Sequence, residues 1–241
     1  MDRAAYTSMN AQEGEHWWFV ARRAIIASLI RAHVALPDDA RILEAGCGTG
    51  GNLDLLRQFG AVDALEYDAQ ARAIAAARGV AHVEAGALPD AIGFGDTRYH
   101  LIALLDVLEH VERDRESLAA LGARLAPGGR LLVTVPAVPW LWSDHDVLHH
   151  HKRRYTAQGL ARVVGDAGLK VEASGYFNSL LFPLAVAQRV AHSLLRRDGG
   201  LDARPAPWLN RALQGVFAAE RHLLGRLSFP IGLSLYAVLS A

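Results

Sequence analysis

The amino-acid sequence predicts an α/β protein in which helices cover both faces of a mainly parallel β-sheet. Strand-like and helix-like segments alternate from residue 41 to residue 176, and such alternation is typical of parallel sheets. Hydrophobic residues make up 51% of the 241-residue chain, which is enough for one large buried core. A last strand-like segment, 232–241, follows a stretch without strand pattern, 178–228. We therefore expect a single domain, 1–241, with a helical insertion at 178–228 before its seventh strand.

The individual elements follow from periodicity and from the residues that end helices. Apolar side chains recur every three or four positions over 15–35, which predicts an amphipathic helix that Pro37 ends. Glycine closes several later helices, where a left-handed residue is favoured. The predicted strands are 41–45, 62–66, 80–85, 101–105, 130–135, 169–176 and 232–241. The predicted helices between them are 52–59, 69–78, 114–125 and 156–167.

Composition excludes several classes of protein. Lysine plus arginine and aspartate plus glutamate number 25 each, so the net charge is zero and no nucleic-acid partner is expected. Cys47 is the single cysteine, which rules out an internal disulfide and favours a reducing, cytoplasmic location. The first residues lack the apolar core of a signal peptide. No stretch reaches the roughly 18 uninterrupted apolar residues that a membrane-spanning helix needs.

The stretch ILEAGCGTGGN, residues 42–52, indicates a nucleotide-like ligand. Its glycines let the backbone approach a ligand closely and expose amide groups at a helix start. Read from Gly46 as G-x-G-x-x-G, it fits the dinucleotide loop of nicotinamide enzymes; read from Glu44 as E-x-G-x-G-x-G, it fits the nucleoside loop of methyltransferases. Glu66, at the tip of the next strand, suits the two hydroxyls of a ribose. The cofactors of nicotinamide enzymes and of methyltransferases both contain adenosine, so these residues do not decide between the two classes of enzyme.

Further motifs follow in order along the chain. They are ALEYDAQARAIAAA, VEAGALPD, LIALLDVLEHVERD, LAPGGRLLVTVP and the C-terminal strand. With these, the chain resembles class I S-adenosylmethionine-dependent methyltransferases over nearly its whole length. The resemblance implies a Rossmann-like sheet of seven strands in order 3-2-1-4-5-7-6, with the last strand antiparallel. It also implies S-adenosylmethionine as cofactor and S-adenosylhomocysteine as product.

The resemblance implies a set of cofactor contacts. Glu44 and the glycine loop would line the methionine part, Glu66 would bind the ribose, and Asp106 would end the fourth strand beside the cofactor. Glu84, with Ala85, would lie near the adenine amino group, although the family more often has aspartate there. The implied cofactor-binding residues are Glu44, Gly46, Gly48, Gly50, Glu66, Glu84, Ala85 and Asp106.

The acceptor side is expected in PWLWSDHDVLHHHKRRYT, which follows the fifth strand at the cofactor-binding end of the sheet. Histidine titrates near neutrality and suits a general base for an oxygen nucleophile. We expect His145 first and His149 second in this catalytic role. A solvated loop with structural histidines is the alternative.

A metal site is a second alternative and is not expected. Asp106, Glu109 and His110 lie on one side of a helix start. The segment DVLEH resembles the Glu-x-x-Glu-His of ubiquinone-biosynthesis O-methyltransferases, some of which use a divalent metal. Its first residue is aspartate here, and an acidic helix start that satisfies its own N–H groups is the simpler interpretation.

Two segments resemble the parts that cover the cofactor in this family: the N-terminal helix, 11–36, and the insertion, 178–228. Residues 180–227 combine an apolar face with an excess of arginine, which favours contact with an anionic membrane surface or, alternatively, core packing or a dimer contact. The sequence does not fix the oligomeric state. The apolar face comprises Leu209, Leu213, Val216, Phe217, Leu223, Leu224 and Leu227.

The sequence thus predicts an enzyme that methylates an acceptor with S-adenosylmethionine, most simply a hydroxyl on a small or lipid-like molecule. N-methylation of a small molecule is the alternative within the class. Outside it stand a nicotinamide oxidoreductase, for which the chain lacks a Tyr-x-x-x-Lys motif, and a non-catalytic protein that binds S-adenosylmethionine.

Overall fold

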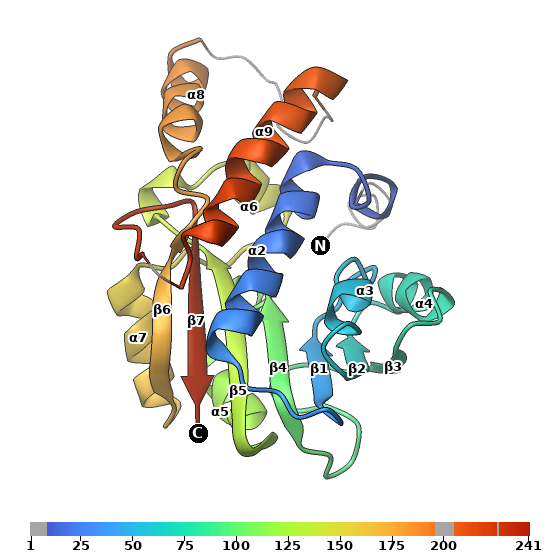
Figure 1. Cartoon of the computed structure of the whole chain (residues 1–241). Helices are drawn as coiled ribbons and strands as arrows, with labels where there is room; N and C mark the ends of the chain where they lie inside the picture. Colours follow the sequence, from blue (N-terminus) through green and yellow to red (C-terminus); the bar gives the residue numbers. More distant parts are fainter. Residues whose placement is uncertain (1–8, 196–204, 226) are drawn as a thin grey trace.

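The sheet has the strand order that the family resemblance implies. The order is β3-β2-β1-β4-β5-β7-β6, with β7 antiparallel to both neighbours and the other pairs parallel (Figure 1). The computed structural model describes residues 9–195, 205–225 and 227–241, without the side chains of His145 and residues 190–195. The strands are β1 (Arg41–Ala45), β2 (Ala61–Glu66), β3 (His82–Ala85), β4 (Tyr99–Leu105), β5 (Leu125–Pro136), β6 (Lys170–Phe177) and β7 (Ser234–Ser240).

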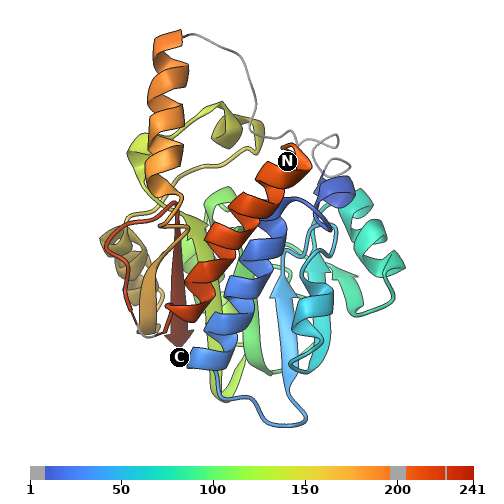
Figure 2. The ribbon, with the colours of Figure 1, turned by 45° about the horizontal axis from the view of Figure 1, so that its top comes forward.

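Helices cover both faces of the sheet, as predicted. Figures 1 and 2 show α2 and α9 side by side across one face, and α5 and α7 pack on the other. The labelled helices are α2 (Trp17–His33), α3 (Leu53–Leu56), α4 (Ala69–Ala77), α5 (Asp114–Gly122), α6 (Asp144–Leu148), α7 (Ala157–Asp166), α8 (Phe182–Leu195) and α9 (Pro207–Ala219). Short 3₁₀ turns are η1 (Leu108–His110), η2 (Pro139–Leu141) and η3 (Glu220–His222).

Each face has its own apolar core. On the α2 face, Ile25 and Leu29 are fully buried, and the rings of Phe177 and Phe217 stack with centroids 6.3 Å apart. The opposite core joins α5 and α7 to the strands through side chains such as Leu121. Full burial of one such side chain stabilises the fold by roughly 1.5–3 kcal/mol. The two cores therefore hold the strand ends in fixed positions.

Two elements differ from the sequence prediction. The helix expected at 52–59 is α-helical only over Leu53–Leu56, because the N–H groups of Gln58 and Phe59 bond to carbonyls three residues back. The strand expected at 130–135 begins earlier, at Leu125, with a register shift opposite the turn-like APGG.

The insertion between β6 and β7 divides into two parts that differ in burial. On the α9 side, Phe217 and Leu224 of the predicted apolar face are buried against α2 and belong to the core, whereas Val216 and Leu227 of the same face are exposed. On the other side, α8 projects beyond the carboxyl end of the sheet (Figure 2). None of the helices in the described parts of the chain has the length and apolarity needed to cross a bilayer.

Candidate active site

The glycine loop lies where the ends of β1, β2 and β4 meet, because β1 pairs with both other strands. The N–H groups of Gly46 and Cys47 both donate to the Leu65 carbonyl, at 2.9 and 3.0 Å. Gly46 has φ +79° and no room for a side chain, since a Cβ there would lie 2.7 Å from Val107 Cγ2. Gly48 has φ +56° and open space where its Cβ would be. The loop thus presents bare backbone to a ligand.

Glu66 connects the loop to the tip of β2. Its side chain accepts hydrogen bonds from the backbone N–H of Gly48 at Oε2 and of Asp68 at Oε1, both at 2.8 Å. The residue is buried, and Tyr67 beside it is 81% exposed. Each carboxylate oxygen has two lone pairs, so the same oxygens retain capacity for two ribose hydroxyls. An exposed aromatic ring next to that carboxylate also offers a surface on which a base could stack.

Glu44 is a buried carboxyl at the end of β1. Asn52 Nδ2 donates to its Oε1 at 2.9 Å, and its Oε2 is buried without a partner among the described residues. Burial is the main reason that its pKa rises from 4.5 to about 7, and the Asn52 hydrogen bond opposes that rise. An orphaned buried oxygen of this kind fits the ammonium group of a bound methionine moiety.

Asp106 follows β4 and is held by a partner that the sequence did not indicate. Arg22 Nη2 lies 2.7 Å from Asp106 Oδ2 and 2.7 Å from Thr134 Oγ1, which donates to Asp106 Oδ1 at 3.0 Å. Arg22 is buried under the ring of Trp18, 5.2 Å from its centroid. Its position follows Trp18 by four residues on the buried face of α2, which is the sequence signal that could have identified it.

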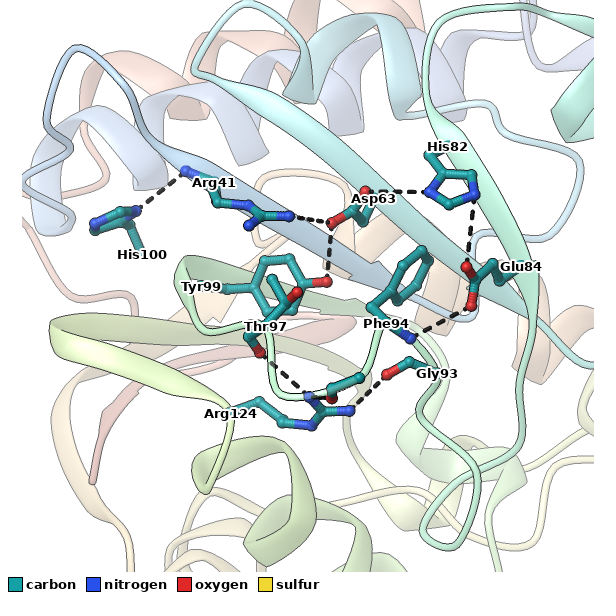
Figure 3. Close-up of polar contacts among 11 residues, drawn as sticks. Arg41, Asp63, His82, Glu84, Gly93, Phe94, Thr97, Tyr99, His100 and Arg124 are labelled. Carbon is teal, nitrogen blue, oxygen red and sulfur yellow. Dashed lines mark hydrogen bonds and ion pairs between the residues drawn. The ribbon is translucent and has the colours of Figure 1, made fainter.

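Glu84 lies apart from these groups. It pairs in register with Leu65, whereas Ala85 pairs with Glu66, so the Glu84 and Glu66 side chains point to opposite faces of the sheet. Its Oε2 accepts from the Phe94 N–H at 3.3 Å, and its Oε1 lies 3.5 Å from His82 Nε2 (Figure 3). The adenine role expected for Glu84 stays a prediction, and the contact seen here is with the loop after β3.

Asp63 centres this second polar cluster, at the amino ends of the strands (Figure 3). Tyr99 Oη donates to Asp63 Oδ2 at 2.9 Å, and Arg41 Nη2 lies 3.3 Å from the same oxygen. Burial and the bond to Asp63 raise the pKa of Tyr99 well above its ordinary range. His100 accepts from the Arg41 N–H at 3.1 Å. Tyr99 and His100 thus serve a structural network.

The N-terminal segment contacts the glycine loop directly. Glu13 is buried, accepts from Thr49 Oγ1 at 2.9 Å, and forms an ion pair with Arg78. Arg23 donates to the Glu13 carbonyl at 2.7 Å. A groove of about 640 Å³ lies between this segment and helices α2, α3 and α4. Glu44, Glu66 and Asp106, which we call the strand-end group, do not line this groove, so the groove is separate from them.

A second polar group includes residues of the segment where the acceptor side is expected. It comprises the buried Glu109 and Asp146 and the half-buried His110 and His151, and we call these four residues the acceptor-side cluster. Asp146 is fully buried; His151 Nδ1 lies 2.9 Å from its Oδ1, and Arg154 donates to both of its oxygens at 2.7 and 2.8 Å. Burial alone would raise the pKa of Asp146, but the bonds from His151 and Arg154 lower it well below its ordinary value. Asp146 is therefore ionised, and His151 Nδ1 must be the donor.

Glu109 and His110, at the end of β4, complete the cluster. Burial, and next the charge of Asp106, raise the pKa of Glu109 well above its ordinary value, and its Oε2 has no partner among the described residues. Burial, and next His151, lower the pKa of His110 to about 4. The His110 and His151 rings lie 4.7 Å apart, edge to face. Burial thus favours the protonated form of Glu109 and the neutral form of His110.

The predicted acceptor-side and metal residues separate in the structure. His145 belongs to α6, but its side chain is outside the described residues; the His149 ring lies 6.1 Å from His151. The alternative metal set is divided, because Asp106 binds Arg22, whereas Glu109 and His110 group with His151. The ligand atoms of these last three residues lie within 4.8 Å of one another. Asp146 and His151 are the pair that sequence reasoning had in its candidate stretch but did not choose.

Comparisons with known proteins agree with this geometry. A family model described as a methyltransferase domain matches residues 16–174, more than half of the chain. No curated protein shows significant sequence similarity. The chain therefore belongs to the methyltransferase-domain family on the strength of the family model.

Solved structures share the fold. A putative methyltransferase from Haloferax volcanii, solved with the Trm112 methyltransferase activator, is 16% identical, with TM-score 0.64 over 99% of this chain and 94% of that chain. An S-adenosylmethionine-dependent methyltransferase from Mesorhizobium loti is 17% identical, with TM-score 0.57 over 88% and 95%. The glycopeptide N-methyltransferase MtfA, solved with S-adenosylmethionine, is 13% identical, with TM-score 0.57 over 90% and 86%.

These findings define the class. The protein is a class I S-adenosylmethionine-dependent methyltransferase, and S-adenosylmethionine is its cofactor. The strand order, with β7 antiparallel, and the family match remove the nicotinamide oxidoreductase alternative.

Proposed function

We propose that this methyltransferase acts on a hydroxyl oxygen of a small or lipid-like acceptor and that the acceptor-side cluster takes up the hydroxyl proton. The observation that carries the proposal is the hydrogen-bonded pair of the buried Asp146 and the half-buried His151, whose ring packs against His110 of η1. A neutral amine can be methylated without a base in the enzyme, whereas a hydroxyl benefits from one. The resemblance of DVLEH to ubiquinone-biosynthesis O-methyltransferases points the same way.

Cofactor binding uses the strand-end group. Glu66 would bind the ribose, and Glu44 and the glycine loop would line the methionine part, with Glu44 against its ammonium. Arg22 holds Asp106 and so fixes the end of β4. When bound, S-adenosylmethionine supplies a methyl group that its sulfonium activates. The bond between this methyl group and sulfur breaks during transfer, and S-adenosylhomocysteine is the product that remains.

The proton transfer uses the cluster. The acceptor oxygen forms the new O–C bond while its proton passes to an imidazole nitrogen of the cluster, and the ionised Asp146 stabilises the imidazolium that forms. His151 is the favoured proton acceptor because Asp146 holds its ring. His110 is a weaker base, since its pKa is lowered to about 4 by burial. Histidines His145 and His149, expected first from the sequence, remain the competing candidates.

The test of substrate class is transfer of label from tritiated S-adenosylmethionine to lipid and aqueous extract fractions, followed by mass spectrometry of the product. We expect an O-methylated product. Glu66→Ala, which should lose cofactor binding, is the control for background label. A product methylated on nitrogen would contradict O-methylation and favour the N-methyltransferase alternative.

The test of the base is a comparison of three variants on that acceptor. His151→Gln should lower turnover by about 10²- to 10⁴-fold and leave cofactor affinity nearly intact, whereas His149→Ala should have a smaller effect. His145→Ala tests the residue expected first from the sequence. If His151→Gln keeps wild-type turnover and one of the other two loses it, the base is the other residue.

Removal of metal ions tests whether the acceptor-side cluster acts as a general base or as a metal site. Glu109, His110 and His151 could share one small cation through ligand atoms within 4.8 Å of one another. The raised pKa of the buried Glu109 favours the metal-free interpretation, because a metal-ligating carboxylate must be ionised. We expect turnover to survive exhaustive chelation. If chelation abolishes turnover and added Mg²⁺, Mn²⁺ or Zn²⁺ restores it, the cluster is a metal centre rather than a general base.

A further inference from the structure

Three side chains join the glycine loop to the N-terminal segment, residues 9–15. Thr49 Oγ1 donates to Glu13 Oε2 at 2.9 Å. Arg78, which follows α4, donates from Nε to the Thr49 carbonyl at 2.7 Å and forms an ion pair with Glu13 Oε1. Each of the three residues therefore bonds to the other two. We call Glu13, Thr49 and Arg78 the N-terminal latch.

The latch is mostly shielded from water. The side chain of Glu13 is 7% exposed and that of Arg78 is 27% exposed, and Thr49 is buried. An exposed ion pair contributes little to an arrangement, because water and salt screen it. A buried carboxylate that loses a partner is left uncompensated, which is much more costly. The latch therefore holds its residues in one arrangement.

Two glycines leave space for the latch. A Cβ on Gly51 would overlap Glu13 Oε2, and a Cβ on Gly50 would lie 3.0 Å from Arg78 Cδ. The backbone of Gly51 is not left-handed, so the close approach of Glu13 is the reason that this position needs glycine. The third glycine of the G-x-G-x-x-G pattern thus has a role in this fold without a dinucleotide.

The latch is also linked to the carboxylate at the tip of β2. Thr49 directly follows Gly48, whose N–H donates to Glu66 Oε2 at 2.8 Å. A shift of Thr49 would therefore move Gly48 and change that hydrogen bond. A binding site that is held in place before the ligand arrives has less ordering to do on binding, which raises its affinity.

We propose that Glu13 and Arg78 are positioning residues for cofactor binding, which act on the glycine loop through Thr49. Docking of the N-terminal segment and binding of S-adenosylmethionine then favour each other, because coupling between two sites is reciprocal. This inference rests on the cofactor contacts proposed above for the glycine loop and Glu66, but it does not depend on the proposed O-methylation.

The experiment is calorimetry of S-adenosylmethionine binding to variants of the full chain. Glu13→Gln should lower the affinity about fivefold or more. Thr49→Val, which keeps the shape but loses the hydroxyl, should do the same, whereas Thr49→Ser should retain the wild-type affinity. Wild-type affinity in both Glu13→Gln and Thr49→Val would overturn the proposal. An equal loss in Thr49→Ser would assign the effect to packing of the methyl group instead.

Glu220→Gln is the matched control for loss of a buried carboxylate. Glu220 is fully buried and accepts from the N–H groups of Ser179 and Leu180 at 2.7 and 2.8 Å, in the loop after β6. Its variant should be less stable in urea but should keep the wild-type affinity for S-adenosylmethionine. A loss of affinity equal to that of Glu13→Gln would assign both effects to general destabilisation and overturn the proposal. Circular dichroism first checks that each variant is folded.

A double-mutant cycle tests the contact between Gly51 and Glu13. Gly51→Ala should weaken binding because its Cβ displaces the Glu13 carboxylate. In the Glu13→Ala background that clash is removed, so Gly51→Ala should add little further loss. If the two losses add instead, Gly51→Ala acts on the loop without Glu13, and the proposal is wrong.

Hydrogen exchange tests the reciprocal effect. S-adenosylmethionine should slow the exchange of residues 9–15 in the wild type, and less so in Arg78→Gln. Equal exchange with and without the cofactor in the wild type would contradict the coupling.

Glu66→Ala separates this inference from the proposed ribose contact. Loss of affinity in Glu66→Ala with none in the latch variants would overturn only the latch. Unchanged affinity in Glu66→Ala with a loss in the latch variants would overturn only the ribose contact and would leave the latch acting on the glycine loop itself.

Discussion

At the scale of single residues, Glu44 is a buried carboxyl whose charge a bound cation would change. It is buried beside the glycine loop with one oxygen unpartnered among the described residues. Its pKa is raised by burial to about 7, so near neutral pH it is divided between its charged and neutral forms. A cation placed against it would favour the charged form.

Glu44 predicts a pH dependence of cofactor binding. Between pH 4.5 and about 7, the Glu44 carboxyl keeps its proton in the folded protein but loses it in the unfolded chain. The stability of the free protein therefore falls as pH rises through that window. A bound ammonium lowers the pKa, so binding releases a proton, and affinity for S-adenosylmethionine should rise with pH up to about 7 and then level off. Calorimetry across this range measures it. Glu44→Gln should give a flatter curve, and an unchanged slope would remove Glu44 from the ammonium site.

The left-handed backbone of Gly48 leads to a prediction about the glycine loop. Its φ of +56° costs a residue with a side chain roughly 1–2 kcal/mol, although space for a Cβ is open. Gly48→Ala should therefore weaken cofactor binding by shifting the loop. The matched control is Gly165→Ala in α7, where φ is not left-handed and nothing lies near the new Cβ. Equal affinity of both variants in calorimetry would argue against a rigid loop.

At the scale of elements, the sheet and its polar cluster can be changed separately from the site. Asp63, Tyr99 and Arg41 lie toward the amino ends of the strands (Figure 3), whereas the predicted cofactor-binding residues Glu44 and Glu66 lie at the carboxyl ends. This separation means that stability and binding can be tested independently.

Tyr99→Phe removes the hydroxyl that donates to Asp63, a carboxylate that is 15% exposed. We expect a loss of about 1 kcal/mol in the free energy of unfolding, with unchanged cofactor affinity. Urea denaturation measures the first and calorimetry the second. Tyr67→Phe, at an exposed position, should leave stability unchanged in the free protein. A fall in cofactor affinity for Tyr99→Phe would link the two ends of the sheet.

The elements themselves were largely predictable. The strand predicted at 41–45 coincides with β1, since its apolar run is bounded by polar residues and the glycine loop. Helix 52–59 was overestimated, because periodicity does not distinguish an α-helix from the 3₁₀-type turns of Gln58 and Phe59. The family resemblance, rather than periodicity, supplied the position of β7 between β5 and β6.

The candidate site could be proposed from the sequence where short motifs indicate its residues, but not where the arrangement depends on tertiary contacts. Glu44 and Glu66 come from short motifs at strand ends. Arg22 was missed, because its partner Asp106 is far away in the sequence. The choice among neighbouring histidines depended on Asp146, which only becomes a buried acceptor once Arg154 folds back onto it. No local pattern reports that arrangement.

At the scale of the whole molecule, ligand binding should stabilise the fold. S-adenosylmethionine at about 100 times its Kd adds about 2.7 kcal/mol, which for a chain of 241 residues raises Tm by several degrees. S-adenosylhomocysteine should act similarly and NAD should not. A thermal-shift series checks this directly. Stabilisation by NAD alone would contradict the assigned cofactor.

The placement of β7 also constrains how the chain reaches its native state. This strand hydrogen-bonds to β5 on one side and β6 on the other, yet both precede it by a long stretch of sequence. Such non-local pairing slows folding. Until β7 pairs with them, β5 and β6 have open edges that another molecule could pair with. Newly made chains are therefore expected to be most prone to aggregation during that interval, and chaperone capacity should limit expression yield.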